Sequence, residues 1–525
     1  MKSLIVSALC LVLAVPLCAQ VSVTTSRNDN SRDGQNLNET ILTPTNVNVT
    51  QFGKLFSQAV DGYIYAQPLY VPNVTIPGLG THNVVYVATE HDSVYAFDAD
   101  NNTGLNATPL WHTSFIDPAN GIYPVSSGEV DCTDLVPEIG ITSTPVIDTS
   151  TQTIFVLART RENGTYVQRL HALNLTTGAE QPNSPVLIRA QVKGTGDGSS
   201  NGVVAFDPLR EAQRPGLLLL NGEVIIAWAS HCDNGPYHGW LMGYDETALT
   251  RTRLFNTTPN GGLGGIWQSG TGVASDGTSM FFATGNGTYD GPKGGADYGD
   301  TVMRLPLATN QSFDFFTPYD QGSFSNGDVD VGSGGVLLLP DQNSGAPHIH
   351  LLVQVGKSGS IYLIDRDHMG RYSPSFNHIV QDLENAIGGS WATPAWWNNN
   401  VYFGGSYDYL RQYTFDPGTG LLSAGAVFLS STYFNFPGPT PSISANGTSD
   451  AIVWALQTDQ YGSGPAILHA YDATDVATEL YNSDQNRSRD NPGPAVKFTV
   501  PTIANGKVYV PTATKLSVYG LLTGK

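Results

Sequence analysis

The sequence has few charged residues. Only 13% of its 525 residues are Asp, Glu, Lys or Arg, whereas about 25% is usual in globular proteins. The 25 Lys and Arg residues form no cluster, so the chain lacks the basic patch that nucleic-acid binding requires. We therefore expect no nucleic-acid partner. The 45 acidic residues give a formal net charge of −20, which favours solubility.

Long hydrophobic segments are also scarce. The one extended apolar stretch, residues 4–17, is shorter than the roughly 20 residues that a membrane helix needs. It is followed by Cys18 and Ala19, which predicts a secretory signal peptide at 1–19, cleaved after Ala19. A lipid anchor on Cys18 is the less favoured alternative, because the bulky Leu17 precedes it. We expect one exported domain at 20–525, secreted or periplasmic, with no membrane span.

Cysteine is rare in the predicted mature chain. Of the four cysteines in the sequence, only Cys132 and Cys232 follow the signal peptide. In an oxidising compartment these two can form a disulfide, and two separate thiols are the alternative. Asn-x-Ser/Thr sequons are frequent, but a chain rich in Asn, Ser and Thr produces them by chance. Glycosylation is therefore left open.

Glycine, proline and aromatic residues are abundant. The chain has 57 Gly, 32 Pro, 24 Tyr, 20 Phe and 8 Trp, and 40% of its residues are hydrophobic. This composition excludes global disorder. It indicates a large core with many tight turns.

A pair of apolar, β-branched strands recurs eight times, about every 60 residues, with no convincing helical period. The pairs lie at 83–89 and 93–98, 153–157 and 169–174, 223–227 and 240–245, 280–284 and 301–305, 350–354 and 361–365, 401–403 and 410–413, 452–456 and 468–472, and 507–510 and 516–519. Repeats of this kind predict an all-β, eight-bladed propeller of four-stranded antiparallel blades. The last unit is one strand short. We predict that the segment 52–60 pairs with it and closes the ring, which removes exposed edge strands.

The blade topology predicts which loops share a face. In an antiparallel blade, the loop leading into the innermost strand and the turn between the second and third strands lie at the same end, the channel mouth. These loops contain Glu138, Trp267, Asp328, Asp330 and Trp391, and the turns contain Glu90, His91, Asp92, Arg161, His231, Asp233, Asn286, Lys357 and Asp408. Cys132 and Cys232 fall in such loops of neighbouring blades, which favours the disulfide. Taken one at a time, these polar residues are also ordinary turn residues.

Over nearly the whole mature chain, the repeats resemble those of the pyrroloquinoline quinone (PQQ) alcohol dehydrogenases, eight-bladed quinoprotein propellers. The most specific matches are Gly-Gly-Ile-Trp at 264–267 and Phe-Phe-Ala-Thr-Gly-Asn-Gly at 281–287. The segment 317–330, which ends in Asp-Val-Asp, and the segment 357–366, which begins with Lys, resemble two further family motifs.

The resemblance implies a role for each matching residue. Trp267 corresponds to the floor on which the quinone stacks, and Asn286 to a calcium ligand. Asp328 corresponds to the catalytic base, and Asp330 to a further metal ligand in lanthanide-using members. Lys357 corresponds to the residue that contacts the quinone oxygens. The residue types suit this chemistry, because a hard cation takes amide and carboxylate oxygens and an Asp beside it can accept an alcohol proton. Trp391, at the mouth, is a further candidate contact for the cofactor.

The chain also departs from the family pattern. Asp233 stands near the position of the calcium-binding Glu, and it joins Asn286, Asp328 and Asp330 as a candidate metal ligand. Cys132 has no adjacent cysteine, Gly327 replaces a Trp, and no haem-attachment motif is present. Asn286 also begins a sequon.

Two hypotheses of different classes follow. In the first, a secreted propeller without catalytic activity binds a small molecule, a glycan or an envelope protein at the channel mouth, with no cofactor. In the second, the protein is an alcohol or sugar dehydrogenase that uses PQQ with Ca²⁺ or a lanthanide. A lyase or hydrolase using Glu138 and Asp233 is a minor third alternative, which no residue spacing supports.

Overall fold

Eight four-stranded sheets form the molecule, and the computed structural model describes residues 20–308 and 313–522. The predicted signal peptide at 1–19 lies outside these residues. The sheets are numbered here as blades 1 to 8. Blade 1 contains β3 (Leu69–Ile76), β4 (Gly80–Ala88), β5 (Ser93–Asp98) and β6 (Trp111–Ser114), and blade 2 contains β9 (Val146–Asp148), β10 (Thr153–Glu162), β11 (Thr165–Asn174) and β12 (Val186–Leu187). Blade 3 contains β15 (Leu218–Leu220), β16 (Glu223–Trp228), β17 (Trp240–Asp245) and β18 (Arg251–Asn256), and blade 4 contains β19 (Ala274–Ser275), β20 (Ser279–Ala283), β21 (Val302–Pro306) and β22 (Asp314–Phe316).

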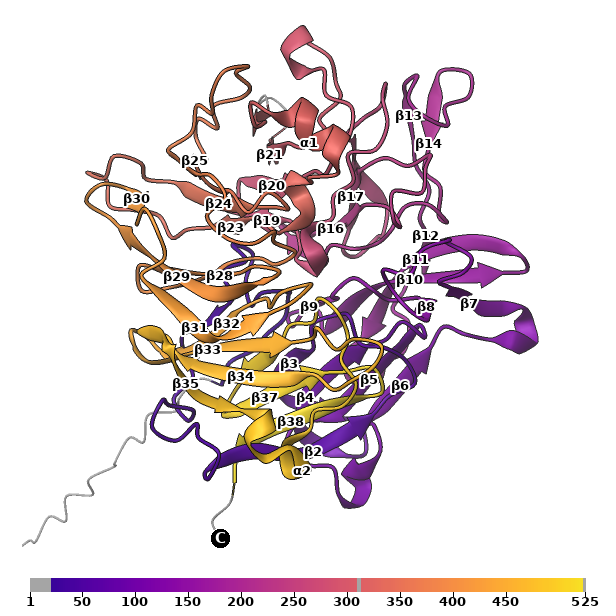
Figure 1. Cartoon of the computed structure of the whole chain (residues 1–525). Coiled ribbons are helices and arrows are strands. Elements are labelled where there is room, and N and C mark those ends of the chain that lie inside the picture. Colours follow the sequence, from indigo (N-terminus) through magenta and orange to yellow (C-terminus); the bar gives the residue numbers. More distant parts are fainter. Residues whose placement is uncertain (1–19, 309–312, 523–525) are drawn as a thin grey trace, which may run out of the picture.

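Blades 5 to 8 continue the ring (Figure 1). Blade 5 contains β23 (Leu337–Leu338), β24 (Leu351–Val355), β25 (Ile361–Asp365) and β26 (Gln381–Leu383), and blade 6 contains β27 (Ala395–Trp397), β28 (Asn400–Gly404), β29 (Asp408–Asp416) and β31 (Phe428–Phe434). Blade 7 contains β32 (Ser442–Asn446), β33 (Ser449–Gln457), β34 (Ile467–Asp472) and β35 (Asp475–Asn482), and blade 8 contains β36 (Thr502–Ala504), β37 (Lys507–Pro511), β38 (Lys515–Leu521) and β2 (Phe52–Ala59). The first strands of neighbouring blades contact one another, as β9 does β15 and β32 does β36. The first strand of each blade is therefore the innermost. The predicted all-β, eight-bladed propeller is confirmed.

The predicted ring closure is also confirmed. Strand β2 pairs antiparallel with β38, from Phe52 opposite Leu521 to Ala59 opposite Lys515. Blade 8 is thus built from segments near both ends of the chain, and it has four strands.

Smaller elements decorate the blades. Strands β7 (Ile122–Ser126) and β8 (Glu138–Ile139) extend blade 2, β13 (Gln191–Lys193) pairs with β14 (Val203–Ala205), and β30 (Leu421–Leu422) pairs with β29. The α-helices of the described residues are α1 (Gln321–Gly327) and α2 (Arg487–Asp490). Helix α1 was not predicted from the sequence. Short 3₁₀ helices lie at Gly104–Ala107, Pro118–Asn120, Gln268–Gly270, Gly291–Lys293, Val331–Ser333 and Ser483–Asn486. Among these described residues, no helix is long and apolar enough to cross a membrane.

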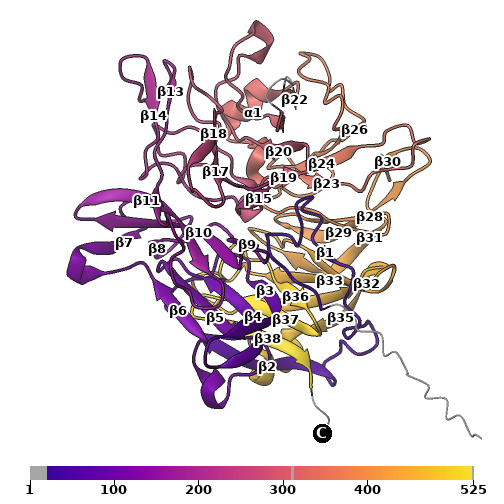
Figure 2. The ribbon, with the colours of Figure 1, turned by 180° about the vertical axis from the view of Figure 1, so that it is seen from behind.

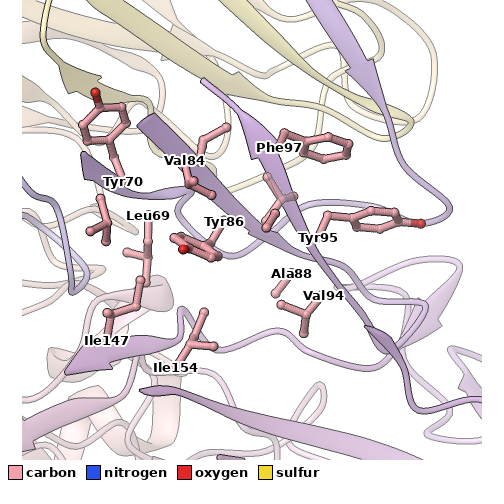
Figure 3. Packing of buried hydrophobic residues seen from close by; sticks show 14 of the residues in the cluster. Leu69, Tyr70, Val84, Tyr86, Ala88, Val94, Tyr95, Phe97, Ile147 and Ile154 are labelled. Carbon is pink, nitrogen blue, oxygen red and sulfur yellow. The ribbon is translucent and has the colours of Figure 1, made fainter. Parts of the chain in front are cut away.

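The hydrophobic core lies between the blades. Leu69 and Tyr86 of blade 1 belong to the same buried cluster as Ile147 and Ile154 of blade 2 (Figure 3). Each inner strand is covered by a neighbouring blade on either side, so β16 is buried from Val224 to Trp228. This explains the continuous apolar runs in the sequence, since strands covered on both faces do not alternate polar and apolar residues.

A segment near the N-terminus circles the centre of the ring. It includes β1 (Gln35–Asn36), which pairs parallel with β32 (Figure 2). Residues 23–36 make a hydrogen bond to the innermost strand of every blade, in chain order: Val23 to Tyr70, Thr24 to Ile147, Asn30 to Leu219 and Ser275, Ser31 to Leu338, Asp33 to Trp396, Gly34 to Ile443 and Asn36 to Ile503. This central segment, which we name the N-terminal ring segment, was not predicted.

Two fully buried arginines anchor the N-terminal ring segment. Arg27 donates to the backbone carbonyls of Pro441 and Pro394, and Arg32 donates to that of Val273. Both guanidinium groups therefore satisfy backbone carbonyls of the residues that immediately precede inner strands.

Candidate functional site

A cavity of about 280 Å³ lies at the channel mouth. Six residues chosen from the sequence line it, namely Asp233, Trp267, Asp328, Asp330, Lys357 and Trp391. They come from the loops and turns of blades 3 to 6, which the blade topology places at one end of the ring. The loops converge as expected, although the chemical roles of these residues stay predictions.

Lys357 joins the two aspartates of the Asp-x-Asp pair. Its Nζ lies 2.6 Å from Asp328 Oδ1 and 2.7 Å from Asp330 Oδ2. Burial alone would lower the pKa of Lys357, but attraction to Asp330 and the hydrogen bonds that Lys357 donates to both carboxylates raise it above its usual value. Lys357 therefore stays charged and holds the two carboxylates together.

The two carboxylates differ in exposure. The side chain of Asp330 is 6% exposed and that of Asp328 is 62% exposed. Burial raises the pKa of Asp330, and the Lys357 ammonium partly offsets this effect. Asp328 follows α1 in a left-handed conformation, with φ 54°, which Asp tolerates better than most residues. Helix α1 thus presents Asp328 to solvent beside the cavity.

Asn286 lies next to this pair, although it is not among the residues that line the cavity. Its backbone N–H donates to Asp330 Oδ1 at 2.7 Å. The preceding Gly285 permits this contact, because a Cβ there would lie 2.3 Å from the same oxygen. The Thr-Gly-Asn turn and the Asp-x-Asp pair are therefore in direct contact.

Two buried polar atoms at the site have no hydrogen-bond partner among the described residues, Asn286 Oδ1 and Trp267 Nε1. An unsatisfied buried polar atom is costly and calls for a ligand or water. Asp233 lies close enough to Asp330 to raise the pKa of Asp330. The site therefore has three carboxylates, those of Asp233, Asp328 and Asp330, and one lysine, Lys357. An amide oxygen and several carboxylates form the donor set that a hard cation takes. The donor types present suit such a cation, but Lys357 already pairs with Asp328 and Asp330, and among the described residues the three carboxylates of the site do not form a ready-made cluster of metal ligands.

The predicted disulfide is confirmed. Cys132 and Cys232 are joined, with their Cα atoms 5.6 Å apart. Cys132 follows β7 in blade 2 and Cys232 follows β16 in blade 3, so the bond links neighbouring blades at the mouth. Cys232 also lines the cavity, which makes the disulfide part of its wall.

A buried charged cluster lies in neighbouring mouth loops. Glu90 Oε2 accepts from Gly140 N at 2.6 Å and from the Thr142 hydroxyl at 3.0 Å. Burial raises the pKa of Glu90 to about 7 and that of Asp92 well above its usual value. Arg159, also fully buried, donates to His231 and attracts both acids. Glu90 therefore gains and loses its proton near neutral pH.

Six further residues line the cavity without having been selected from the sequence: Asp134, Arg214, Ser269, Ser333, Phe436 and Phe498. Arg214, Phe436 and Phe498 lie in the loops leading into β15, β32 and β36. The topological rule that located Trp391 would have found them, but it was applied mainly to acidic residues and tryptophan. The blade topology therefore predicted the correct loops, but the Arg and Phe residues in those loops were not considered as candidates.

Comparison with solved structures identifies the fold. The crystal structure of quinohemoprotein alcohol dehydrogenase from Comamonas testosteroni superposes with a TM-score of 0.61, at 14% identity over 97% of this chain and 82% of that one. A europium-containing methanol dehydrogenase superposes with a TM-score of 0.62, at 13% identity over 95% of this chain and 98% of that one. No family model and no curated protein sequence matches. The chain therefore has the eight-bladed fold of the quinoprotein dehydrogenases.

Proposed function

We propose that this protein is an exported, quinoprotein-like propeller that binds a small, planar, polar ligand in the mouth cavity. The observation that carries the proposal is the lining of one cavity by Trp267, Trp391 and Lys357. Indole rings offer flat faces for a planar ligand, and the lysine offers a charged donor. The disulfide supports export, because such bonds persist in oxidising compartments.

The size of the cavity favours a small molecule over a glycan chain or an envelope protein. Its volume of about 280 Å³ is near the lower end of the range for small-molecule pockets. The glycan and protein ligands expected from the sequence alone are therefore the alternatives to be tested.

The contact of Lys357 with Asp328 and Asp330 favours a second candidate, a PQQ- and metal-dependent oxidoreductase. Bound PQQ would supply a two-electron acceptor for the oxidation of an alcohol or sugar hydroxyl. Asn286, Asp330 and Asp233 would hold Ca²⁺ or a lanthanide. A cation bound through Asp330 Oδ2 competes with Lys357, which lies 2.7 Å from that oxygen.

Asp328 is the residue suited to proton transfer in this second candidate. Its carboxylate is mostly exposed and beside the cavity, so a substrate hydroxyl can reach it and donate its proton. Lys357 orients that carboxylate, and its positive charge stabilises negative charge that develops in the cavity.

Binding is tested with the purified mature protein and PQQ, alone, with Ca²⁺ and with a lanthanide. Thermal shift and quenching of tryptophan fluorescence report binding, and dye-linked alcohol oxidation reports turnover. We expect binding that Trp267→Leu weakens by about ten-fold, since a base-sized planar group stacked on an aromatic ring is worth about 1 to 3 kcal/mol. Absence of binding in all three mixtures would exclude the dehydrogenase.

If turnover is observed, Asp328→Asn should abolish it and leave PQQ binding within about two-fold. Asp450→Asn, on the exposed hairpin of blade 7, is the matched control. Unchanged turnover in the Asp328 variant would remove Asp328 from the base role. Binding without turnover in the wild type would favour the non-catalytic function.

A further inference from the structure

Two cations flank one aromatic ring at the mouth cavity. The guanidinium carbon of Arg214 lies 4.3 Å from the ring centroid of Phe498, and Lys497 Nζ lies 5.5 Å from it. Lys497 is also 4.8 Å from the ring of Tyr461. Arg214 is 6% exposed and Lys497 is 5% exposed. Both charges are therefore largely withdrawn from water.

Carboxylates compensate these two cations only weakly. Within residues 20–308 and 313–522, the one carboxylate within ion-pair distance of Lys497 is that of Asp134, at 3.8 Å, and its side chain is half exposed. Arg214 has no carboxylate within 4 Å and its side chain donates no hydrogen bond to those residues. By contrast, the buried Arg27, Arg32 and Arg159 all donate hydrogen bonds to neighbouring groups. Arg214 and Lys497 thus differ from the structural arginines.

This arrangement costs stability. A buried charge without a partner loses its hydration and gains little in return. Burial lowers the pKa of Arg214 and the pKa of Lys497, and the proximity of Arg214 lowers that of Lys497 further. The two like charges would be better separated if their role were structural alone.

Arg214 lines the cavity, and Lys497, which is not among the lining residues, lies beside three residues that are. These three are Asp134, Phe498 and Phe436, whose ring centroid is 5.9 Å from Lys497 Nζ. A ligand in the cavity can therefore bring an anion to both cations and relieve the penalty of their burial. The Lys357 ammonium is less suited to this purpose, because Asp328 and Asp330 already pair with it.

We propose that Arg214 and Lys497 form an anion subsite of the mouth cavity, and that the natural ligand carries an oxyanion, such as a carboxylate, sulfate or phosphate, beside its planar part. The ligand class rests on the proposed function, whereas the anion subsite itself does not. The aromatic rings around the subsite exclude water, which strengthens charge-assisted hydrogen bonds to the oxyanion.

The subsite is tested with the mature protein and four probes at constant ionic strength: inorganic sulfate, inorganic phosphate, naphthalene-2-carboxylate and the neutral 2-naphthamide. Calorimetry gives the affinity of each. We expect sulfate or phosphate to bind to the wild type, and the carboxylate to bind more tightly than the amide. Lys497→Met and Arg214→Met should each weaken anion binding by about ten-fold or more, since hydrogen bonds to charged groups are worth about 1.5 to 3 kcal/mol.

Two further variants and a melting measurement on Lys497→Met separate a binding role from a structural one. Asp134→Asn should strengthen anion binding, because it removes the carboxylate that competes for Lys497. Lys497→Met should raise the melting temperature without ligand, because it removes an uncompensated buried charge. Lys293→Met, at an exposed position, should change neither quantity.

The outcomes distinguish the two proposals. Failure of sulfate, phosphate and the carboxylate to bind, or unchanged anion affinity in both methionine variants, would overturn the subsite. Equal binding of the carboxylate and the amide without inorganic anion binding would also overturn it, while the planar-ligand function stands. If inorganic anions bind but neither naphthalene compound nor PQQ does, the subsite stands and the planar-ligand function fails.

Discussion

Replacement of Glu90 by Gln should change how the stability of the protein depends on pH. Glu90 is fully buried, and burial raises its pKa from 4.5 to about 7, partly opposed by hydrogen bonds from Gly140 and Thr142 and by Arg214 and Arg159. The folded protein therefore holds a proton between these two pH values that the unfolded chain has released. Stability consequently falls as pH rises through this window.

The size of the effect follows from the shift in pKa. The difference between 4.5 and about 7 corresponds to about 3 kcal/mol of unfolding free energy, which is lost by about pH 8. Glu90 Oε2 accepts both hydrogen bonds and Oε1 has no partner among the described residues. Glutamine can keep those two bonds through its oxygen and place its amide where the protonated oxygen lies. Glu90→Gln thus mimics the protonated acid at every pH.

Urea unfolding curves between about pH 5 and pH 8.5 measure the difference. We expect Glu90→Gln to lie within about 1 kcal/mol of the wild type near pH 5 and to exceed it by about 3 kcal/mol above pH 8. Asp33, whose pKa burial also raises to about 7, leaves the variant with part of the original slope. Glu384→Gln, at an exposed position, serves as the control. An unaltered pH dependence in Glu90→Gln would refute the assignment of the proton to Glu90.

Three further predictions concern stability. Cys132→Ser should lower it by about 4 to 5 kcal/mol in the chain-entropy model, because the disulfide joins residues 100 apart; a wild type whose melting is unaffected by reductant would contradict this. Gly34→Ala should cost about 2 to 4 kcal/mol, since Gly34 has φ +72° and a Cβ there would lie 2.2 Å from Arg27 Nη2, whereas Gly345→Ala, with no atom within 4 Å, should be nearly neutral. Deletion of residues 20–60 should lower the melting temperature of the whole domain, because it removes both β2 and the N-terminal ring segment; wild-type melting would refute the shared blade.

Several features of this fold could be predicted because they follow from local chemistry. Runs such as Val224–Trp228 are apolar and rich in β-branched residues, which identifies buried strands without knowledge of their partners. The sequence contains eight repeats, an incomplete last unit and an unassigned strand at 52–60. Together these three features predicted a closed ring. The same alternation of strands and turns located the mouth loops, and with them Trp267, Asp328 and Lys357.

Other features depend on residues that are distant in the sequence and have no periodic pattern. The N-terminal ring segment is irregular, and its hydrogen bonds to all eight blades exist only once the ring has formed. The exposure that distinguishes Asp328 from Asp330 comes from the end of α1 and from Lys357.

The sequence by itself therefore determined the number of blades, the closure of the ring and the loops that meet at the mouth, because hydrophobic period and turn chemistry are local. Only the tertiary structure decided which charges are paired. It left Lys497 and Arg214 buried beside the cavity, with the half-exposed Asp134 as the one carboxylate of the described residues within 4 Å of Lys497, and it raised the pKa of Glu90 to about 7. Pairing and burial are properties of the packed molecule, because solvation and Coulomb attraction depend on distance in space.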